Sequence, residues 1–332
     1  MNLLIVGGTR FLGKALVEAS QAIGHNVTLF NRGQSHPDWF LNIEQLHGDR
    51  NRDLSILKGR QWDAVIDTCA YFPRQVRELL EAIGGSIGHY TLISTISVYA
   101  DFSQPGMDET APVATIDDPT IEEITGGSYG PLKALCEQAA LDSLGEQVLI
   151  VRPGLIVGPF DPTDRFTYWP ARISRGGDLL VPDSPDWETQ IIDVRDLAKW
   201  TIWMVEKRAN GIFNATGPDQ TLTFGEILDA SQMVSGASVK FHWVDTQFLL
   251  DHSVEPWSDL PLWLPGSEYA GMDRINIQKA INHGLEFRPL KATISDTLDW
   301  EKNRPPDHDW KAGLKSDREA ELLSKWQSLQ NG

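Results

Sequence analysis

A tyrosine and a lysine stand four residues apart in the middle of the chain, at Tyr129 and Lys133. Residues at this spacing lie on one face of a helix, and the apolar pattern over about residues 131–144 predicts a helix here. A free phenol titrates near ~10, but a neighbouring ammonium group favours its ionised form. Tyr129 is therefore a candidate general acid or base, and Lys133 a candidate for lowering the pKa of that phenol.

A glycine-rich segment at the start of the chain indicates a second kind of chemistry. It consists of Gly7, Gly8, Thr9, Arg10, Phe11, Leu12 and Gly13. An apolar run precedes it and a helical pattern follows it. Glycines let a backbone turn tightly and approach a pyrophosphate, and the free N–H groups at a helix start bind anions. The context predicts a dinucleotide-binding turn, with a purely structural turn as the alternative.

The residues near this turn bear on which dinucleotide would bind. Arg10 replaces the middle glycine of the usual G-x-x-G-x-x-G pattern, and the second predicted strand ends in Asn31 and Arg32, without the acid that usually binds a ribose 2′-hydroxyl. A guanidinium group suits a 2′-phosphate. We expect NADP, with NAD possible; two solvated surface arginines are the alternative. Asp49 is positioned either to accept from the adenine amino group or to stabilise a turn.

The elements that must position these residues follow from the hydrophobic pattern. Short apolar runs over residues 3–6, 27–30, 43–46, 64–66, 90–94 and 148–151 alternate with helical patterns over about 12–23, 73–83 and 131–144. Gly24 is placed to end the first helix, and Gly84 and Gly85 the second. This order predicts an α/β fold, a doubly wound parallel sheet of the Rossmann type. Its ligands should bind at the carboxyl edge of the sheet.

The second half of the chain has a different composition. Ten of the twelve tryptophans lie beyond residue 160, among frequent prolines and glycines. We expect a dinucleotide-binding domain over residues 1–155 and a smaller, mixed α/β substrate lobe over 156–332, with some segments returning to the first domain. Thr223 with Glu226, and Ser316 with Glu319, predict capping boxes at two helix starts.

Composition excludes some classes of function. The 332 residues are 41% hydrophobic and 23% charged, which is typical of a folded globular protein. The formal net charge of −17 disfavours bulk attraction to nucleic acid or to anionic lipid. Arg50 and Arg52 are nevertheless candidates for a small basic patch. No run approaches the ~18 apolar residues that a membrane span needs.

The cysteines and histidines give no sign of a disulfide framework or a metal site. Cys69 and Cys136 are the two cysteines, and neither belongs to a C-x-x-C motif. We expect them to be buried thiols in a reducing cytoplasm.

Taken together, these segments resemble the extended and atypical short-chain dehydrogenase/reductases, the NAD(P)-dependent epimerase/dehydratase group. The resemblance covers about the first 235 residues. It rests on the glycine turn, on the Ser-Thr-x-x-Val-Tyr sequence at 94–99, on Tyr129 and Lys133, and on residues 152–159, 192–198 and 211–217.

The resemblance implies roles for individual residues. Thr95 would orient the substrate oxygen that Tyr129 protonates or deprotonates, with Ser94 and Ser97 as alternatives. Lys133 would also hold the nicotinamide ribose. The other implied cofactor contacts are Pro153, beside the nicotinamide, and Cys69 and Ala70, through their backbone.

Candidate substrate contacts are Tyr71, Arg165 and Tyr168. For the segment that opens the second lobe, the alternative is structural: Asp161 and Asp164 cap turns and Trp169 fills the core.

The resemblance leaves three functions open. We expect an NADP-dependent oxidoreductase that moves hydride to or from a small carbonyl or alcohol, because Leu155 stands where nucleotide-sugar enzymes of the family commonly carry an asparagine. An epimerase or dehydratase acting on a nucleotide sugar is the first alternative. The second is a cofactor-binding, RNA-associated protein without dehydrogenase activity, since Arg10 is common in an atypical subgroup that includes chloroplast stem-loop RNA-binding proteins. A homodimer through the helices near 73–84 and 131–144 is also expected.

Overall fold

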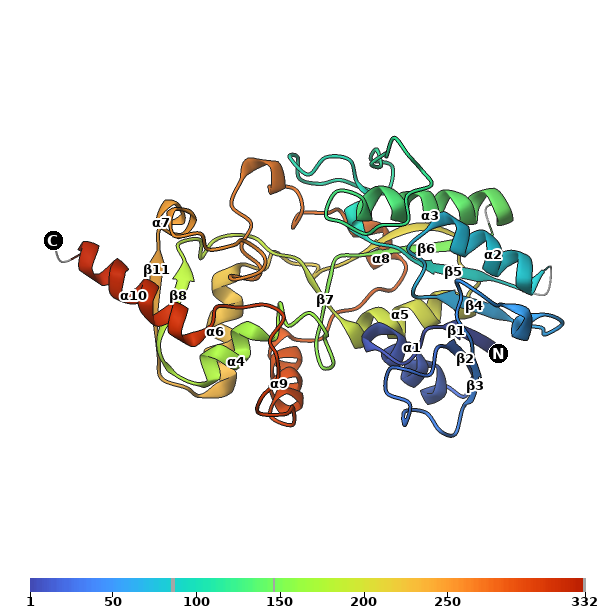
Figure 1. Cartoon of the computed structure of the whole chain (residues 1–332), viewed down its shortest axis with the longest axis horizontal. Coiled ribbons are helices and arrows are strands. Elements are labelled where there is room, and N and C mark those ends of the chain that lie inside the picture. The colour runs from blue at the N-terminus through green and yellow to red at the C-terminus, as the bar shows by residue number, and fades with distance from the viewer. Residues whose placement is uncertain (85–86, 146, 331–332) are drawn as a thin grey trace.

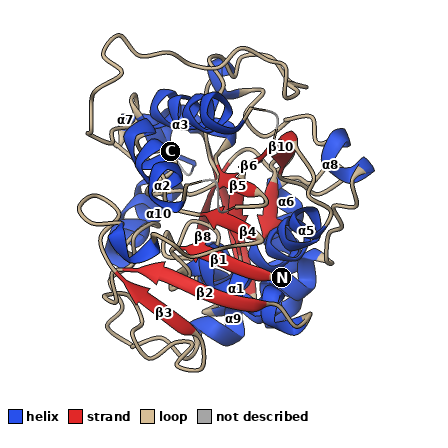
Figure 2. Cartoon of the chain, turned by 90° about the vertical axis from the view of Figure 1, so that its right-hand side faces the viewer, coloured by secondary structure: helices blue, strands red, loops and turns tan. Residues whose placement is uncertain are grey.

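The fold was analysed in a computed structural model that describes residues 1–84, 87–145 and 147–330. Within these residues the central sheet has seven parallel strands in the order β3-β2-β1-β4-β5-β6-β10 (Figure 2). The strands are β1 (Asn2–Val6), β2 (Asn26–Asn31), β3 (Glu44–His47), β4 (Ala64–Asp67), β5 (Tyr90–Ile93), β6 (Val148–Pro153) and β10 (Gly211–Ala215). The predicted doubly wound parallel sheet is confirmed, and its first six strands differ from the expected bounds by at most two residues.

Helices cover both faces of the sheet because its strands are apolar on both sides. Leu3 and Ile5 of β1 pack with α1 (Phe11–Ala22) and α5 (Val194–Glu206), whereas Leu4 and Val6 pack on the other side with α2 (Pro73–Ile83) and α3 (Tyr129–Leu144). This alternation follows from the two-residue period of a strand. Gly84 follows the end of α2 as expected, and Gly85 lies outside the described residues.

Helix α3 begins at Tyr129, two residues before the expected start. Proline is tolerated in the first turn of a helix, where its missing N–H group has no intrahelical partner, so Pro131 does not mark the boundary. The earlier start places Tyr129 and Lys133 within one regular helix.

Two elements of the second half return to the central sheet: α5 packs on α1, and β10 pairs with β6. Most of the other elements form a second lobe (Figure 1). They are α4 (Tyr168–Ser174), β8 (Gly177–Pro182), α6 (Phe224–Ser235), β11 (Val239–Val244), α7 (Thr246–Asp251), α9 (Leu290–Glu301) and α10 (Ser316–Gln330). Strands β8 and β11 pair in parallel within it. The division at residue 155 stays a prediction.

Short elements connect the two parts. Strands β7 (Leu155–Val157) and β9 (Ile191–Asp193) pair with each other near the junction, and helix α8 (Gln278–Asn282) lies against β10.

Single 3₁₀ turns occur at Ser55–Leu57, Ile96–Val98 and Ser267–Tyr269. Among residues 1–84, 87–145 and 147–330, no helix has the length and hydrophobicity that a bilayer span requires.

One of the two expected capping boxes forms. Thr223 caps α6, and Glu226 returns a hydrogen bond to its backbone. The prediction of a capping box at the start of α10 is wrong. The Glu319 carboxylate turns inward, where it pairs with Arg172 at 2.7 Å and accepts from the Leu180 N–H at 3.1 Å. A charged partner and a buried backbone donor hold this carboxylate more strongly than a solvated helix end would.

The start of α1 lies very close to the chain that leaves β1. A Cβ atom on Gly13 would lie 2.6 Å from the Gly8 nitrogen and 2.8 Å from its Cα. Both atoms are backbone atoms of a tight turn, so neither moves easily. Only glycine at position 13 allows α1 to begin against this turn.

We therefore expect Gly13→Ala to lower the free energy of unfolding by about 1–3 kcal/mol, because the added methyl group overlaps the backbone. Urea denaturation measures the change. Gly126→Ala is the matched control, since a Cβ at Gly126 meets nothing within 4 Å. Equal stability of the two variants would contradict the close approach of α1 to the turn.

Candidate functional site

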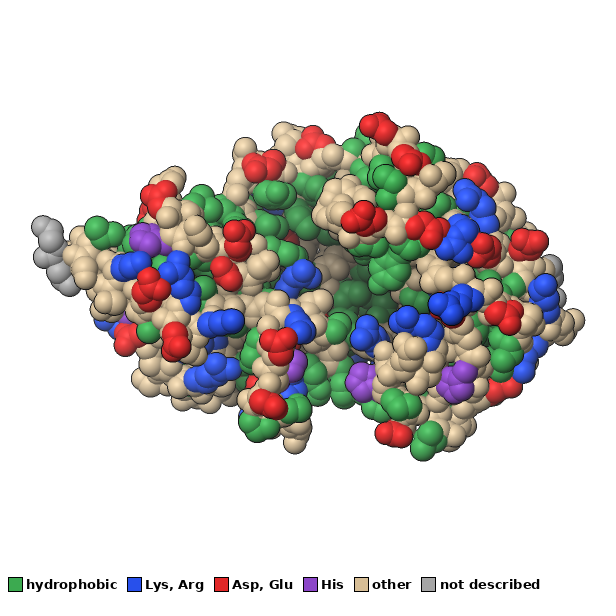
Figure 3. All heavy atoms as spheres, viewed as in Figure 1, with side chains coloured by type: hydrophobic (Ala, Val, Ile, Leu, Met, Phe, Trp, Pro, Cys, Tyr) green, Lys and Arg blue, Asp and Glu red, His purple; other side chains and the backbone are tan. Residues whose placement is uncertain are grey.

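A cleft of about 620 Å³ opens at the carboxyl edge of the central sheet, near the junction with the second lobe. Figure 3 shows this hollow between the two parts of the molecule, with Lys and Arg side chains along its edge. The glycine turn, the ends of β2, β5 and β6, the start of α3 and the residues after β7 all contribute to its walls. Parallel sheets bind ligands at this edge.

The glycine turn fits a dinucleotide. A Cβ on Gly7 would lie 2.3 Å from Thr68 Oγ1, and one on Gly8 would lie 2.6 Å from a methyl carbon of Leu29; both glycines have positive φ. The first N–H groups of α1 have no partner within the helix. All seven residues from Gly7 to Gly13 line the cleft, so backbone and helix start together form a cradle for phosphate groups.

The residues expected around the adenosine also line the cleft. Arg10 and Arg32 are both exposed there. Asn31 is buried and accepts from the Gly33 N–H at 2.7 Å, which fixes the bend after β2. Asp49 accepts from the Asn51 N–H at 2.9 Å, so it stabilises a turn while it lines the cleft. The geometry is compatible with both interpretations of Asp49.

Lys133 is a buried cation held by two carbonyl groups. Its ammonium group donates to Ala70 O at 2.7 Å and to Ile93 O at 2.8 Å, and the residue is only 4% exposed. These carbonyls follow β4 and end β5, so the lysine connects α3 to two neighbouring strands. A lysine has three donors, which leaves one for a group in the cleft.

Tyr129 lies beside Tyr71 and Thr95 in the same cleft. Burial, with a smaller contribution from Tyr71, raises the pKa of Tyr129 to about 12, although the Thr95 hydroxyl acts in the opposite direction. Burial dominates this pKa, and the expectation that Lys133 lowers it stays a prediction. Tyr129 is a protonated phenol at neutral pH.

Of the three candidate hydroxyl groups, that of Thr95 acts on the Tyr129 phenol and opposes the rise of its pKa. Thr95 Oγ1 also accepts from the Ser97 N–H and lies 3.1 Å from Ser97 Oγ. Ser94 instead donates to Glu137 at 2.5 Å, and Glu137 forms a buried ion pair with Arg152. The geometry therefore favours Thr95 as the residue that orients a substrate oxygen.

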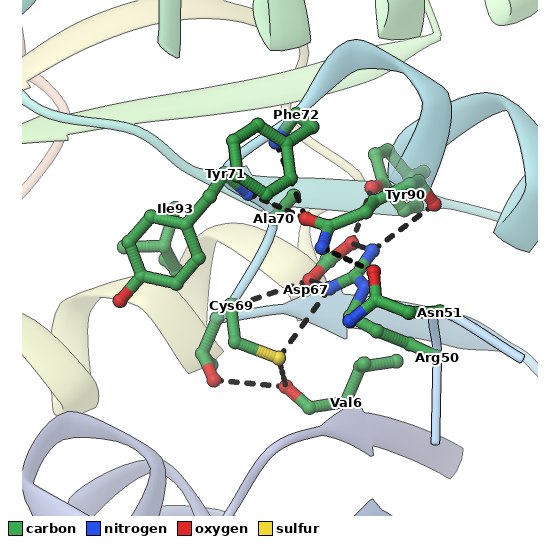
Figure 4. A network of polar contacts seen from close by, with 12 residues as sticks. Val6, Arg50, Asn51, Asp67, Cys69, Ala70, Tyr71, Phe72, Tyr90 and Ile93 are labelled. Atoms are coloured by element: carbon green, nitrogen blue, oxygen red, sulfur yellow. Dashed lines mark hydrogen bonds and ion pairs between the residues drawn. The ribbon is translucent and has the colours of Figure 1, made fainter. Parts of the chain in front are cut away.

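A buried ion pair supports the loop between β4 and α2 (Figure 4). Arg50 donates to both oxygens of Asp67, at 2.7 and 2.8 Å, and to Gln75 O at 3.1 Å. Tyr90 and the Cys69 N–H also donate to Asp67. Burial opposes ionisation of Asp67, but the Arg50 charge, together with the hydrogen bonds from Arg50 and the Cys69 N–H, outweighs it and holds the pKa of Asp67 below its ordinary value.

Sequence reasoning missed this pair and misplaced one of its members. Arg50 is 8% exposed and bound to Asp67, so the proposal that it begins a surface basic patch is wrong; Arg52 is exposed. The two partners are 17 residues apart, in different elements, and no spacing rule relates them. An arginine three residues after the end of β3 was the only available signal.

The remaining sequence candidates divide into two groups. Cys69, Tyr71 and Pro153 line the cleft, and the Tyr71 and Tyr129 ring centroids lie 6.5 Å apart. Ala70 contributes its carbonyl to Lys133, as described above. Arg165 and Tyr168 are not brought to the cleft wall.

The two second-lobe candidates have other contacts. The Arg165 guanidinium lies over the Trp257 ring, 5.4 Å from its centre. Tyr168 is buried and packs against Trp169 and Trp310 in the core of the second lobe, because α4 turns that face inward. Trp169 fills the core and Asp161 accepts from its own turn, as the structural alternative expected. Leu155, Ile156 and Thr163 are wall residues that sequence reasoning did not select.

Replacing Arg50 with methionine should lower the free energy of unfolding by about 3–5 kcal/mol, because the substitution leaves Asp67 buried without its cation. Chemical denaturation measures this change. Arg52→Met is the control: this arginine is exposed and lies 3.7 Å from Asp49, so its loss should cost less than about 0.5 kcal/mol. If both variants match the unsubstituted protein, Arg50 does not stabilise the loop.

Comparison with known proteins places the chain in a family. The profile of the NAD dependent epimerase/dehydratase family matches residues 3–216. The chloroplast stem-loop binding protein of 41 kDa b from Arabidopsis thaliana is 28% identical over 257 residues; the match covers 71% of this chain and 63% of that protein, so the chain spans less than two thirds of its curated relative.

Two solved structures illustrate the likeness in fold. WbmH from Bordetella bronchiseptica, in complex with NAD⁺, superposes with a TM-score of 0.68 at 17% identity, over 91% of this chain and 98% of that one. UDP-N-acetylglucosamine 4-epimerase from Bacillus cereus gives 0.68 at 16% identity, over 93% and 99%. The family match over residues 3–216 shows that the chain belongs to the NAD dependent epimerase/dehydratase family.

Proposed function

We propose that this protein is an epimerase or dehydratase that acts on a nucleotide sugar with a bound NAD(P). The observation that carries the proposal is the convergence of Thr95, Tyr129 and Lys133 with the glycine turn on one cleft beside the second lobe. The family match supports it, and the similar structures include UDP-sugar 4-epimerases. The family match favours this function over the small-carbonyl reductase that the sequence suggested first.

The cleft has suitable groups for each part of the cofactor. The turn from Gly7 to Gly13 would hold the pyrophosphate, Arg32 the adenosine ribose, and Lys133 the nicotinamide ribose, beside Pro153. When bound, the nicotinamide supplies hydride acceptance and return at the carbon that carries the reacting hydroxyl.

Tyr129 moves the proton in this proposal. To accept the hydroxyl proton while hydride leaves the carbon, Tyr129 must be a phenolate. Its pKa is about 12, and a fall to about 7 would need roughly 7 kcal/mol of extra stabilisation of the phenolate at 1.36 kcal/mol per pKa unit. A positive charge in a water-poor cleft acts in that direction. Thr95 holds the substrate oxygen next to the phenol.

The alternative reductase has one observation in its favour. Leu155 and Ile156 line the cleft, and apolar walls suit a small carbonyl compound as well as a sugar ring. The second alternative, RNA association, is supported by the similarity to the chloroplast stem-loop binding protein from Arabidopsis thaliana.

Native mass spectrometry and turnover assays test the proposal and separate these outcomes. We expect retained NAD(P) and conversion of UDP-glucose or dTDP-glucose without net release of reduced cofactor. Stoichiometric NADPH consumption with small carbonyls, and no effect of nucleotide sugars, would support the reductase instead. A salt-dependent RNA mobility shift without turnover would support RNA association.

Substituting Tyr129 with phenylalanine should lower turnover by about 10²- to 10⁴-fold, the usual contribution of a general acid or base. Cofactor affinity should change little, because the ring remains. Steady-state kinetics and cofactor titration measure the two quantities. Tyr269→Phe, on the exposed turn of the second half, should retain full turnover; undiminished turnover of the Tyr129 variant would exclude this mechanism.

We also propose that Arg32 favours NADP over NAD. Arg32→Asp should lower NADP affinity by at least about tenfold and NAD affinity far less, because an acid repels the 2′-phosphate but can bind a 2′-hydroxyl. Fluorescence titration with both cofactors measures the ratio. Arg77→Asp, which makes the same charge change on the exposed side of α2, is the control. Equal loss of affinity for both cofactors would remove Arg32 from this role.

A further inference from the structure

Asp161 is a buried carboxylate on the wall of the cleft. It lies in the loop that leads from β7 to α4, where the chain crosses into the second lobe, and it is 1% exposed. Leu155, Ile156, Pro162 and Thr163 line the cleft beside it. No step described so far uses this side chain.

Only one of its two oxygens is hydrogen-bonded. Oδ1 accepts from the Thr163 N–H and from Thr163 Oγ1, both at 2.8 Å. Oδ2 is buried and has no hydrogen-bond partner among the described residues. A carboxylate accepts several hydrogen bonds, and a buried acceptor left without a donor costs free energy.

Asp164, in the same loop, is a buried carboxylate whose partners are all residues of the protein. Asp164 pairs with Arg304 at 2.8 Å and His308 at 3.0 Å, and it accepts from the Lys311 N–H. Asp161 has no ion pair of this kind among the described residues. Arg165 is near enough to affect it, but its guanidinium lies over Trp257. Burial accordingly raises the pKa of Asp161 to about 6.

We propose that Asp161 is a substrate-binding residue, whose Oδ2 accepts a hydrogen bond from a hydroxyl group of the sugar. This inference rests on the proposed function. A carboxylate repels a diphosphate, so Asp161 marks the sugar end of the substrate site rather than the nucleotide end. The apolar neighbours Leu155 and Ile156 offer a hydroxyl no side-chain acceptor, which makes the free oxygen the available partner.

The test compares a nucleotide sugar with its nucleotide alone. Calorimetry on the cofactor-loaded protein measures the affinity for UDP-glucose or dTDP-glucose, whichever binds, and for UDP or dTDP. In Asp161→Ala, affinity for the nucleotide sugar should fall at least tenfold, or about 1.4 kcal/mol, while affinity for the nucleotide stays constant. Asp161→Asn retains the acceptor for Thr163 and should show a smaller loss in the same direction.

Asp273→Asn is the matched control. Burial also raises the pKa of Asp273 to about 6, but both its oxygens have donors, from Trp187 and Gln190, and it does not line the cleft. Its substitution should leave affinity for the nucleotide sugar unchanged. If Asp161→Ala does not fold, Asp161→Asn decides the question by the same measurements.

Three results would overturn the inference, and they differ from one another. If the unsubstituted protein binds no nucleotide sugar, the proposed function fails and the role of Asp161 fails with it. If nucleotide sugars bind and both Asp161 variants bind them equally well, the function stands and Asp161 is not a contact. If the cofactor content, or the affinity for nucleotide alone, falls in parallel, Asp161 supports the fold or the cofactor instead.

Discussion

The buried ammonium group of Lys133 is the interaction on which the site depends. A charge removed from water needs partners, and those of Lys133 are the carbonyl oxygens of Ala70, just after β4, and of Ile93, at the end of β5. Lys133 reaches both carbonyl oxygens only when its helix, α3, lies across this edge of the sheet. The same placement fixes Tyr129, one turn earlier, in the cleft. The positions of Lys133 and Tyr129 at the cleft therefore have one cause, the packing of α3 across this edge of the sheet.

The second requirement is that the Ala70 carbonyl stays in place. The loop that carries it is held by Asp67, which accepts hydrogen bonds from Arg50, Tyr90 and the Cys69 backbone. A buried ion pair of this kind adds little net stability compared with an apolar core, because both charges lose their hydration. Its effect is geometric: Arg50 also bonds Gln75 O at the start of α2, so sheet, loop and helix share one network.

The cleft contains exposed cationic side chains, although the molecule as a whole is negatively charged. The net charge is −17, yet Arg10 and Arg32 are exposed at the cleft beside the glycine turn, and the incompletely bonded Asp161 lies on the loop that enters the second lobe. Local groups decide what binds at contact distance, while net charge acts over longer range and is screened by salt. Cationic groups and helix N–H groups suit phosphates; a carboxylate suits hydroxyl groups.

The sequence by itself determined the parallel sheet, the glycine turn and the placement of Tyr129 and Lys133 on one helix, because each depends on spacing within one element or between adjacent elements. It could not reveal the Arg50–Asp67 pair, the inward turn of Glu319 or the burial of Tyr168, since these depend on segments that meet only after packing. The pKa of Tyr129 also belongs to the tertiary structure: residue types gave the neighbouring charge, but only the folded chain decides how much water remains around the phenol.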